Sequence, residues 1–154
     1  MNTMCDGEYF YSVELRDEST NRVIRYNMEG NNLTQLSPDE HNVHMFCSTE
    51  NYLYYNLRDE ISIGKDSSGN DIMVRKSDIY RVPKDGGEAE LVYSLPDDMK
   101  THCIFNFLVD GNYLYALYGA YNPETKTVDE SQNNAPYDFL RINLTTGDIY
   151  YITE

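Results

Sequence analysis

The stretch DGNYLYALYGAYN, residues 110–122, decides the fold because it has two relatives in the same chain. It opens on Asp-Gly and continues as Tyr-x-Tyr; DGEYFYSVEL begins at Asp6 and TENYLYYNL begins at Thr49. Alternating side chains of this kind are typical of a β-strand, whose successive residues point to opposite faces of a sheet. The repetition therefore predicts one strand that recurs three times.

Other elements recur around each Tyr-x-Tyr strand. Downstream lies an apolar–Arg–apolar strand, then a Gly five or six residues after the Arg, then a short apolar strand. Upstream, HNVHMFCS (41–48) and HCIFNFLV (102–109) align without a gap, whereas only residues 1–5 precede the first Tyr strand. The repeating unit thus has four strands, and the first copy lacks room for a full first strand.

A four-stranded unit with apolar residues on both faces must stack on a neighbour to be stable. The β-propeller is the architecture that stacks such units. We expect an all-β fold, a β-propeller-like array of about three four-stranded antiparallel blades in one continuous repeat domain. The blades are an incomplete first one at 1–40, a second at 41–98 and a third at 99–154.

Two insertions between the second and third strands break the period. In the second blade, residues 61–76 (ISIGKDSSGNDIMVRK) predict an extended hairpin, and in the third blade residues 119–136 predict a long polar loop. Because loops often form binding surfaces, Tyr118 and Tyr121, which lead into that loop, are candidate binding residues. Single helical turns are expected at 37–40 and 95–101.

The composition and charge of the chain limit the kinds of molecule that it can bind. The formal net charge of −14 argues against nucleic acid and anionic membranes, which both attract basic proteins. No apolar run is long enough for a membrane span. The three cysteines form no disulfide framework and no Cys-x-x-Cys pair; we expect Cys47 and Cys103 to be buried and Cys5 to be exposed.

The repeat resembles a known group of domains. NYLYY, SDIYRVPKDGGEAELVY and DFLRINLTTGDIYYIT are similar to the Tyr-rich bacterial propeller domains of unknown function, distant relatives of the six-bladed propellers of the low-density-lipoprotein-receptor type. The resemblance implies a propeller and, from the wider superfamily, binding of proteins or ligands; it implies no catalytic residue. The chain departs from the receptor propellers, whose signature contains Trp, because it has none.

Three units are fewer than the six of a full propeller, so exposed sheet faces are expected. Either further blades lie outside this chain, which is the favoured interpretation, or copies self-associate to complete a ring. Residues 1–5 lack the basic start and apolar core of a signal peptide. The compartment is therefore unknown; an extracellular or cell-envelope location would follow if the chain belongs to a longer exported protein.

Several residues are candidates for function, each with a structural alternative. Arg25, Arg81 and Arg141 recur at one position, where we expect each to cap a strand face and pair with a carboxylate. His41 and His102 stand at the start of equivalent strands, and His44 lies close to His41 but out of register with it. If these strands line the channel of a propeller, His41 and His102 could share a metal ion. The alternative is that each histidine is simply a polar residue at the end of a strand. Residues 66–71 (DSSGND) resemble a calcium loop faintly and a hairpin turn more closely. The acceptor motifs at Asn32 and Asn143 carry little weight without a eukaryotic secretory signal.

Catalytic motifs are absent from the sequence: there is no Gly-x-Ser-x-Gly, no phosphate-binding loop and no His-Glu-x-x-His. We therefore expect no catalytic residue, no metal and no cofactor, and a non-enzymatic module that binds an unidentified protein or glycan or mediates assembly. One alternative is a part of a propeller hydrolase or lyase whose catalytic residues lie in other blades. The other alternative is a purely structural arc that oligomerises into a ring.

Overall fold

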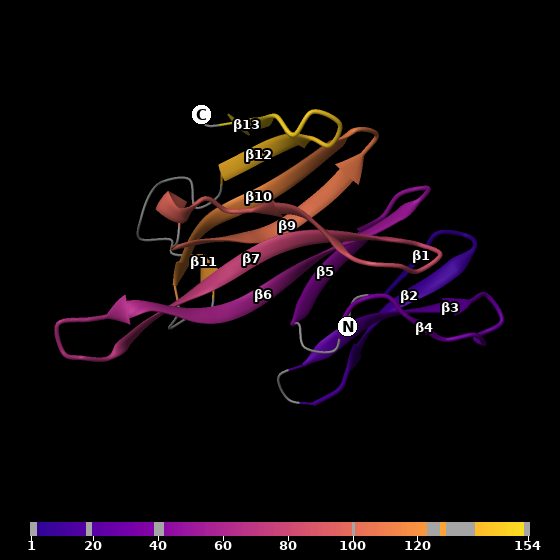
Figure 1. Cartoon of the computed structure of the whole chain (residues 1–154), viewed down its shortest axis with the longest axis horizontal. Coiled ribbons are helices and arrows are strands. Elements are labelled where there is room, and N and C mark those ends of the chain that lie inside the picture. The colour runs from indigo at the N-terminus through magenta and orange to yellow at the C-terminus, as the bar shows by residue number, and fades with distance from the viewer. Residues whose placement is uncertain are drawn as a thin grey trace. The chain divides into compact units, whose positions relative to one another are not determined.

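The computed structural model describes residues 3–17, 20–38, 42–99, 101–122, 127–128 and 138–152. Within these ranges the chain is all-β, with three antiparallel sheets that follow one another along the sequence (Figure 1). The fold is therefore the expected β-propeller-like array of four-stranded blades. The chain divides into two compact units, one made of residues 1–58 and 79–93 and the other of residues 59–78 and 94–154.

The first sheet is short. It has the order β1-β2-β3-β4, with β1 at Thr3–Cys5, β2 at Tyr9–Leu15, β3 at Asn21–Asn27 and β4 at Thr34–Gln35. Although the sequence offers no room for a full first strand, three residues suffice to pair β1 with β2. The first sheet thus contains all four strands, with a truncated one at its edge.

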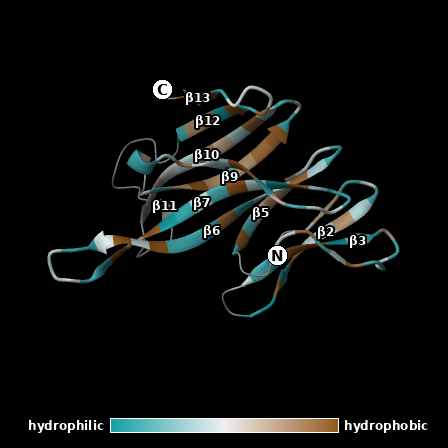
Figure 2. Cartoon of the chain, in the orientation of Figure 1, coloured by the Kyte–Doolittle hydropathy of each residue, from teal (hydrophilic) through white to brown (hydrophobic). Residues whose placement is uncertain are grey.

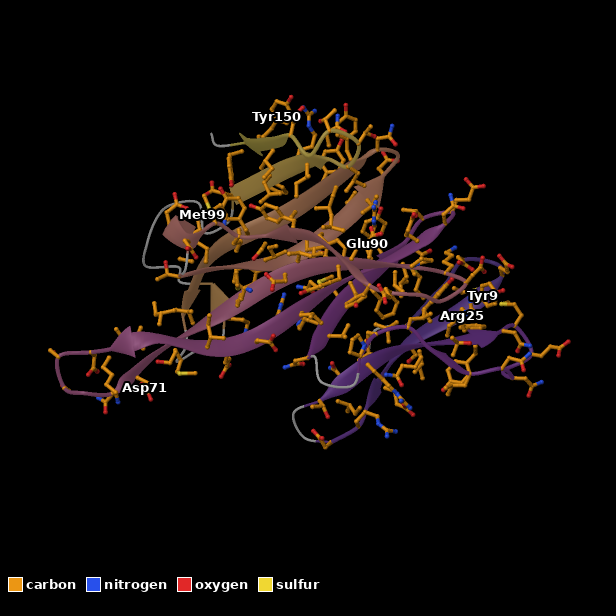
Figure 3. The ribbon with its side chains drawn as sticks, in the orientation of Figure 1. Tyr9, Arg25, Asp71, Glu90, Met99 and Tyr150 are labelled. Atoms are coloured by element: carbon orange, nitrogen blue, oxygen red, sulfur yellow. The ribbon has the colours of Figure 1, made fainter. Side chains whose placement is uncertain are left out.

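The second sheet carries the predicted hairpin. Its order is β5-β6-β7-β8, with β5 at Val43–Ser48, β6 at Tyr52–Lys65, β7 at Asp71–Pro83 and β8 at Glu90–Ser94. Strands β6 and β7 are 14 and 13 residues long, so they extend together to the turn beside Asp71 (Figure 3). The extended hairpin predicted over 61–76 is confirmed.

The third sheet has the core order β9-β10-β12-β13, with β9 at His102–Asp110, β10 at Tyr113–Asn122, β12 at Asp138–Asn143 and β13 at Ile149–Ile152. The short strand β11, Thr127–Val128, pairs with the end of β10, so part of the predicted loop over 119–136 is strand. Residues 119–122 of the predicted loop also belong to β10, so the loop was predicted to begin too early; residues 123–126 and 129–136 lie outside the described residues.

The 3-10 turn η1 at Asp97–Met99 confirms the helical turn expected in 95–101. The turn expected at 37–40 lies partly outside the described residues. Of the cysteines, Cys103 is buried, Cys47 is half-buried and Cys5 is exposed. In the part of the chain that the structure describes, no helix is long and apolar enough to cross a membrane.

The core of the first unit lies between the first and second sheets. One face of β2 and β3, with Tyr11 and Val23 fully buried, packs against one face of the second sheet, where Leu53 and Tyr55 are equally buried. Strand alternation places these side chains on facing surfaces. Figure 2 shows hydrophobic and hydrophilic segments mixed along the strands. The removal of this apolar surface from water is the main force that joins the two blades.

Candidate functional site: an apolar pocket beside His102

The recurring arginines lie on tyrosine rings. The guanidinium carbon of Arg25 is 4.3 Å from the ring centroid of Tyr9 (Figure 3), and that of Arg81 is 4.8 Å from the Tyr52 ring. Arg141 lies between two rings, 5.0 Å from Tyr113 and 4.8 Å from Tyr150. A cation over the face of an aromatic ring is attracted by the ring quadrupole. The Tyr-x-Tyr and apolar–Arg–apolar motifs therefore form one structural unit in each sheet.

The carboxylate partner expected for each arginine is present for only one of them within the described residues. Arg81 forms an ion pair with Glu90 at 2.7 Å. Arg25 instead donates to the backbone oxygen of Lys84, and the buried Nε atoms of Arg25 and Arg141 have no hydrogen-bond partner in the described part of the chain. The arginines thus stabilise the blades through the tyrosine rings.

A pocket of about 410 Å³ lies within the second unit. Its walls come from the hairpin of β6 and β7, from the segment around η1 (labelled by Met99 in Figure 3) and from the first residue of β9. The lining mixes apolar and polar side chains. Its apolar residues are Ile61, Ile63, Val74, Leu95, Pro96 and Met99, and its polar or charged residues are Ser62, Lys76, Ser77, Asp97 and His102.

Ser77 is the unusual polar group of this pocket. The residue is 1% exposed, and its Oγ has no hydrogen-bond partner in the described residues. A buried hydroxyl without a partner costs roughly 1–3 kcal/mol. The neighbouring Asp78 is already engaged, because it pairs with Lys76 at 2.9 Å and accepts a hydrogen bond from Ser94 at 2.5 Å.

His102 stands at the wall of the pocket, on the first residue of β9. Its ring centroid is 6.2 Å from that of Tyr118, which is itself 6.1 Å from the ring of Tyr151. Burial, followed by the nearby charges of Asp138 and Tyr151, raises the pKa of Tyr118. Tyr118 is therefore a neutral side chain buried in the third sheet. The sequence had placed it at the entrance to the loop that follows.

The structure describes only one residue of the predicted histidine pair, His102. His41 lies outside the described residues, and His44 is exposed on β5 in the other unit. Within the described ranges no three His, Cys, Asp or Glu side chains are grouped so that they could hold a metal ion. A channel site shared by His41 and His102 stays a prediction, and so does a role for Tyr121, whose side chain is not described.

The calcium-like stretch 66–71 is a hairpin turn. The Asp66 carboxylate accepts hydrogen bonds from the backbone N–H groups of Ser68 and Asn70 at 2.8 and 2.9 Å. Gly69 adopts φ +86°, which only glycine reaches without strain. The Asp66 oxygens are thus used by the turn. Asn143 likewise accepts from the backbone N–H of Thr145, and Asn32 adopts φ 52° in its turn.

Sequence reasoning named His102 but missed the rest of the pocket. Its walls come from three segments, 61–63, 74–77 and 95–102, whose proximity depends on how the hairpin folds over the third blade's entry segment. The only available signal was the presence of the apolar residues Ile61, Ile63 and Val74 in a hairpin that is otherwise mostly polar and charged.

Comparison with known proteins gives likenesses of structure alone. No family model matches the chain, and no curated protein matches it. Three solved structures are similar: a mutant of Synechocystis apocarotenoid oxygenase (ACO) and cobalt-substituted Synechocystis ACO, each with 13% identity and a TM-score of 0.50, and an ACO/RPE65 chimera with 14% identity and a TM-score of 0.49. Each match covers 94% of this chain.

The chain spans about a third of the length of these solved structures, 33–34%. The likeness supports the propeller-type fold; it does not show kinship with the propellers of the low-density-lipoprotein-receptor type. It also contradicts the expected non-enzymatic module, because the neighbours that share the fold are oxygenases. That expectation rested on the absence of catalytic sequence motifs. Such an absence does not distinguish a binding propeller from part of a propeller enzyme.

Proposed function

We propose that the chain supplies blades and a substrate pocket to a β-propeller enzyme that acts on a small, mostly apolar molecule. The observation that carries the proposal is the pocket beside His102, whose volume lies in the range of about 300–1,000 Å³ typical of small-molecule sites. The likeness to apocarotenoid oxygenases supports the enzymatic class and, by the name of those enzymes, an apocarotenoid as the kind of substrate.

The pocket's own groups suit such a substrate. Ile61, Ile63 and Val74 would contact its apolar part, since burial of that surface is favourable without directional bonds. These residues bind and orient; none of them is assigned a role in bond breaking.

The described residues do not fit a metal centre of the kind implied by the cobalt-substituted neighbour, because they offer no group of three suitable ligands. Ligands for such a centre would have to come from residues that the structure does not describe or from outside this chain. No reaction step through a metal is therefore derived. The finer resemblance to the Tyr-rich bacterial propeller domains of unknown function stays a prediction.

A ligand titration tests the proposal. Retinal, an apocarotenal, is added to the purified chain, and the shift of its absorption band and the quenching of tyrosine fluorescence are followed. We expect saturable binding that weakens at least tenfold in Ile61→Glu, because a carboxylate on the pocket wall opposes an apolar ligand.

The matched control is Ile72→Glu. Ile72 lies on the same hairpin and is 41% exposed against 39% for Ile61, but it does not line the pocket. Its variant is expected to bind like the wild type. Equal weakening in both variants, or no saturable binding by the wild type, contradicts the proposed pocket.

A further inference from the structure

The third sheet repeats, position by position, the face of the first sheet that is buried against the second. In the first sheet Tyr11 pairs across the strands with Met4 and Arg25. In the third sheet Tyr115 pairs in the same way with Leu108 and Arg141. The matching positions are Met4 and Leu108, Asp6 and Asp110, Tyr9 and Tyr113, Tyr11 and Tyr115, Val13 and Leu117, Val23 and Phe139, Arg25 and Arg141.

The two faces differ in exposure. In the first sheet Tyr11 and Val23 are 0% exposed, because the second sheet covers them. In the third sheet the counterpart of Val23, Phe139, is 53% exposed, and Leu108 is also 53% exposed. Tyr150 on β13, labelled in Figure 3, adds a further half-exposed ring to the same face. A contiguous apolar face of this kind marks an interaction surface.

A charge pair accompanies the covered face. The Nζ of Lys84, in the turn after the third strand of the second sheet, donates to the carboxylate of Asp6 at the Asp-Gly turn of the first. Both side chains are only 12% exposed. Asp6 also accepts hydrogen bonds from the Tyr11 hydroxyl and from the backbone N–H of Tyr9, both at 2.9 Å. The pair therefore joins one blade to the next at the edge of their apolar contact.

The third sheet presents the acidic half of this pair alone. Asp110 stands before Gly111 as Asp6 stands before Gly7, but it has no ion-pair partner among the described residues, whereas Asp6 pairs with Lys84. Lys84 lies three residues after Arg81, and the corresponding position of the first sheet is Met28, three residues after Arg25. If a second copy of this chain docked through its first sheet, the thioether of its Met28 would therefore lie where the carboxylate of Asp110 needs a cation.

We infer that this face of the third sheet docks a further four-stranded antiparallel sheet that carries a lysine at the position of Lys84, and that the occupant is not a second copy of this chain. The apolar contact between the third sheet and this partner would resemble the contact between the first and second sheets. Asp110 selects the partner, since leaving a carboxylate without its cation at a buried edge is costly. This inference does not depend on the proposed substrate pocket.

The test introduces the missing lysine into the first sheet of this chain. In Met28→Lys, the first sheet of one copy carries the lysine that Asp110 of another copy would pair with. Light scattering over a concentration series is expected to show a monomeric wild type and a concentration-dependent association of Met28→Lys that is at least tenfold tighter. The double variant Met28→Lys, Asp110→Asn is expected to lose that association.

Met28→Gln is the matched control, because it removes the thioether and adds no charge; it is expected to behave like the wild type. Three results overturn the inference. They are association of the wild type as strong as that of Met28→Lys, a Met28→Lys variant that stays monomeric, and association that persists unchanged when Asp110 is replaced. Circular dichroism and the unfolding midpoint of each variant establish that it is folded.

Discussion

Single residues of this chain act through repeated pairings. An arginine over a tyrosine ring occurs in each of the three sheets, and the two tyrosines of each Tyr-x-Tyr motif hold similar geometry, with ring centroids 6.3–6.4 Å apart. Pairs of this kind contribute about 0.5–1.5 kcal/mol each beyond the burial of area. The recurrence of Tyr and Arg in the sequence therefore reflects the packing within each blade.

Asp6 is the residue whose ionisation matters most for the first unit. Burial disfavours its charged form, but the hydrogen bonds from Lys84, Tyr9, Glu8 and Tyr11 outweigh burial and lower the pKa of its carboxyl below the ordinary value of 3.8. A carboxyl with a lowered pKa in the folded state stabilises the protein above its ordinary pKa. That contribution is lost as the pH falls below about 4, toward the folded-state pKa.

We therefore predict that Asp6→Asn lowers the free energy of unfolding at pH 7 by about 2 kcal/mol, because Lys84 loses its charged partner. The difference between variant and wild type should shrink as the pH is lowered below 4. Urea unfolding at pH 7, 5 and 3 measures it. A difference that stays constant over this range would contradict the assigned role of the charge.

At the scale of elements, the hairpin of β6 and β7 is the most distinctive part. Its side chains form ion pairs along the strands, Arg75 with Glu60 at 3.0 Å and Lys65 with Asp71 at 3.6 Å, and its base provides one wall of the pocket. Since exposed pairs contribute little, the register depends on the turn at Asp66.

Replacing Asp66 by Ala should loosen this hairpin without unfolding the sheets. The variant loses the acceptor for the N–H groups of Ser68 and Asn70, so faster hydrogen exchange of the amides in 61–76 is expected. Asp66→Asn, which keeps an acceptor oxygen, should be affected less. Millimolar Ca²⁺ should leave the wild-type exchange rates unchanged; protection by Ca²⁺ would show that residues 66–71 bind the ion.

At the scale of the whole molecule, the sequence predicted the blades because their signals are local and repeated. Tyr113 and Tyr115 share their pattern with two other strands, and residues 61–76 alternate as a hairpin does. The first blade was expected to lack a strand, and a three-residue β1 was overlooked because so short a strand leaves no periodicity.

Function was less predictable, for a physical reason. The pocket depends on contacts between Ile61, Ser77 and His102, which are far apart in the sequence and belong to no motif. The arginine partners were predicted only in part. The 26 acidic residues made an ion pair the obvious expectation, and Arg81 forms one with Glu90, but all three arginines lie over tyrosine rings. At 13% identity the likeness to oxygenases is visible in the backbone alone.

The most direct test of the central claim, that an enzyme substrate occupies the pocket beside His102, is a map of backbone amide shifts by NMR as retinal is added to the wild-type chain. The account predicts saturable shifts concentrated in 61–63, 74–77 and 95–102, with the amide of Ser77 among the largest. Saturable shifts concentrated in the first sheet, at 3–35, or no saturable shift at all would contradict it.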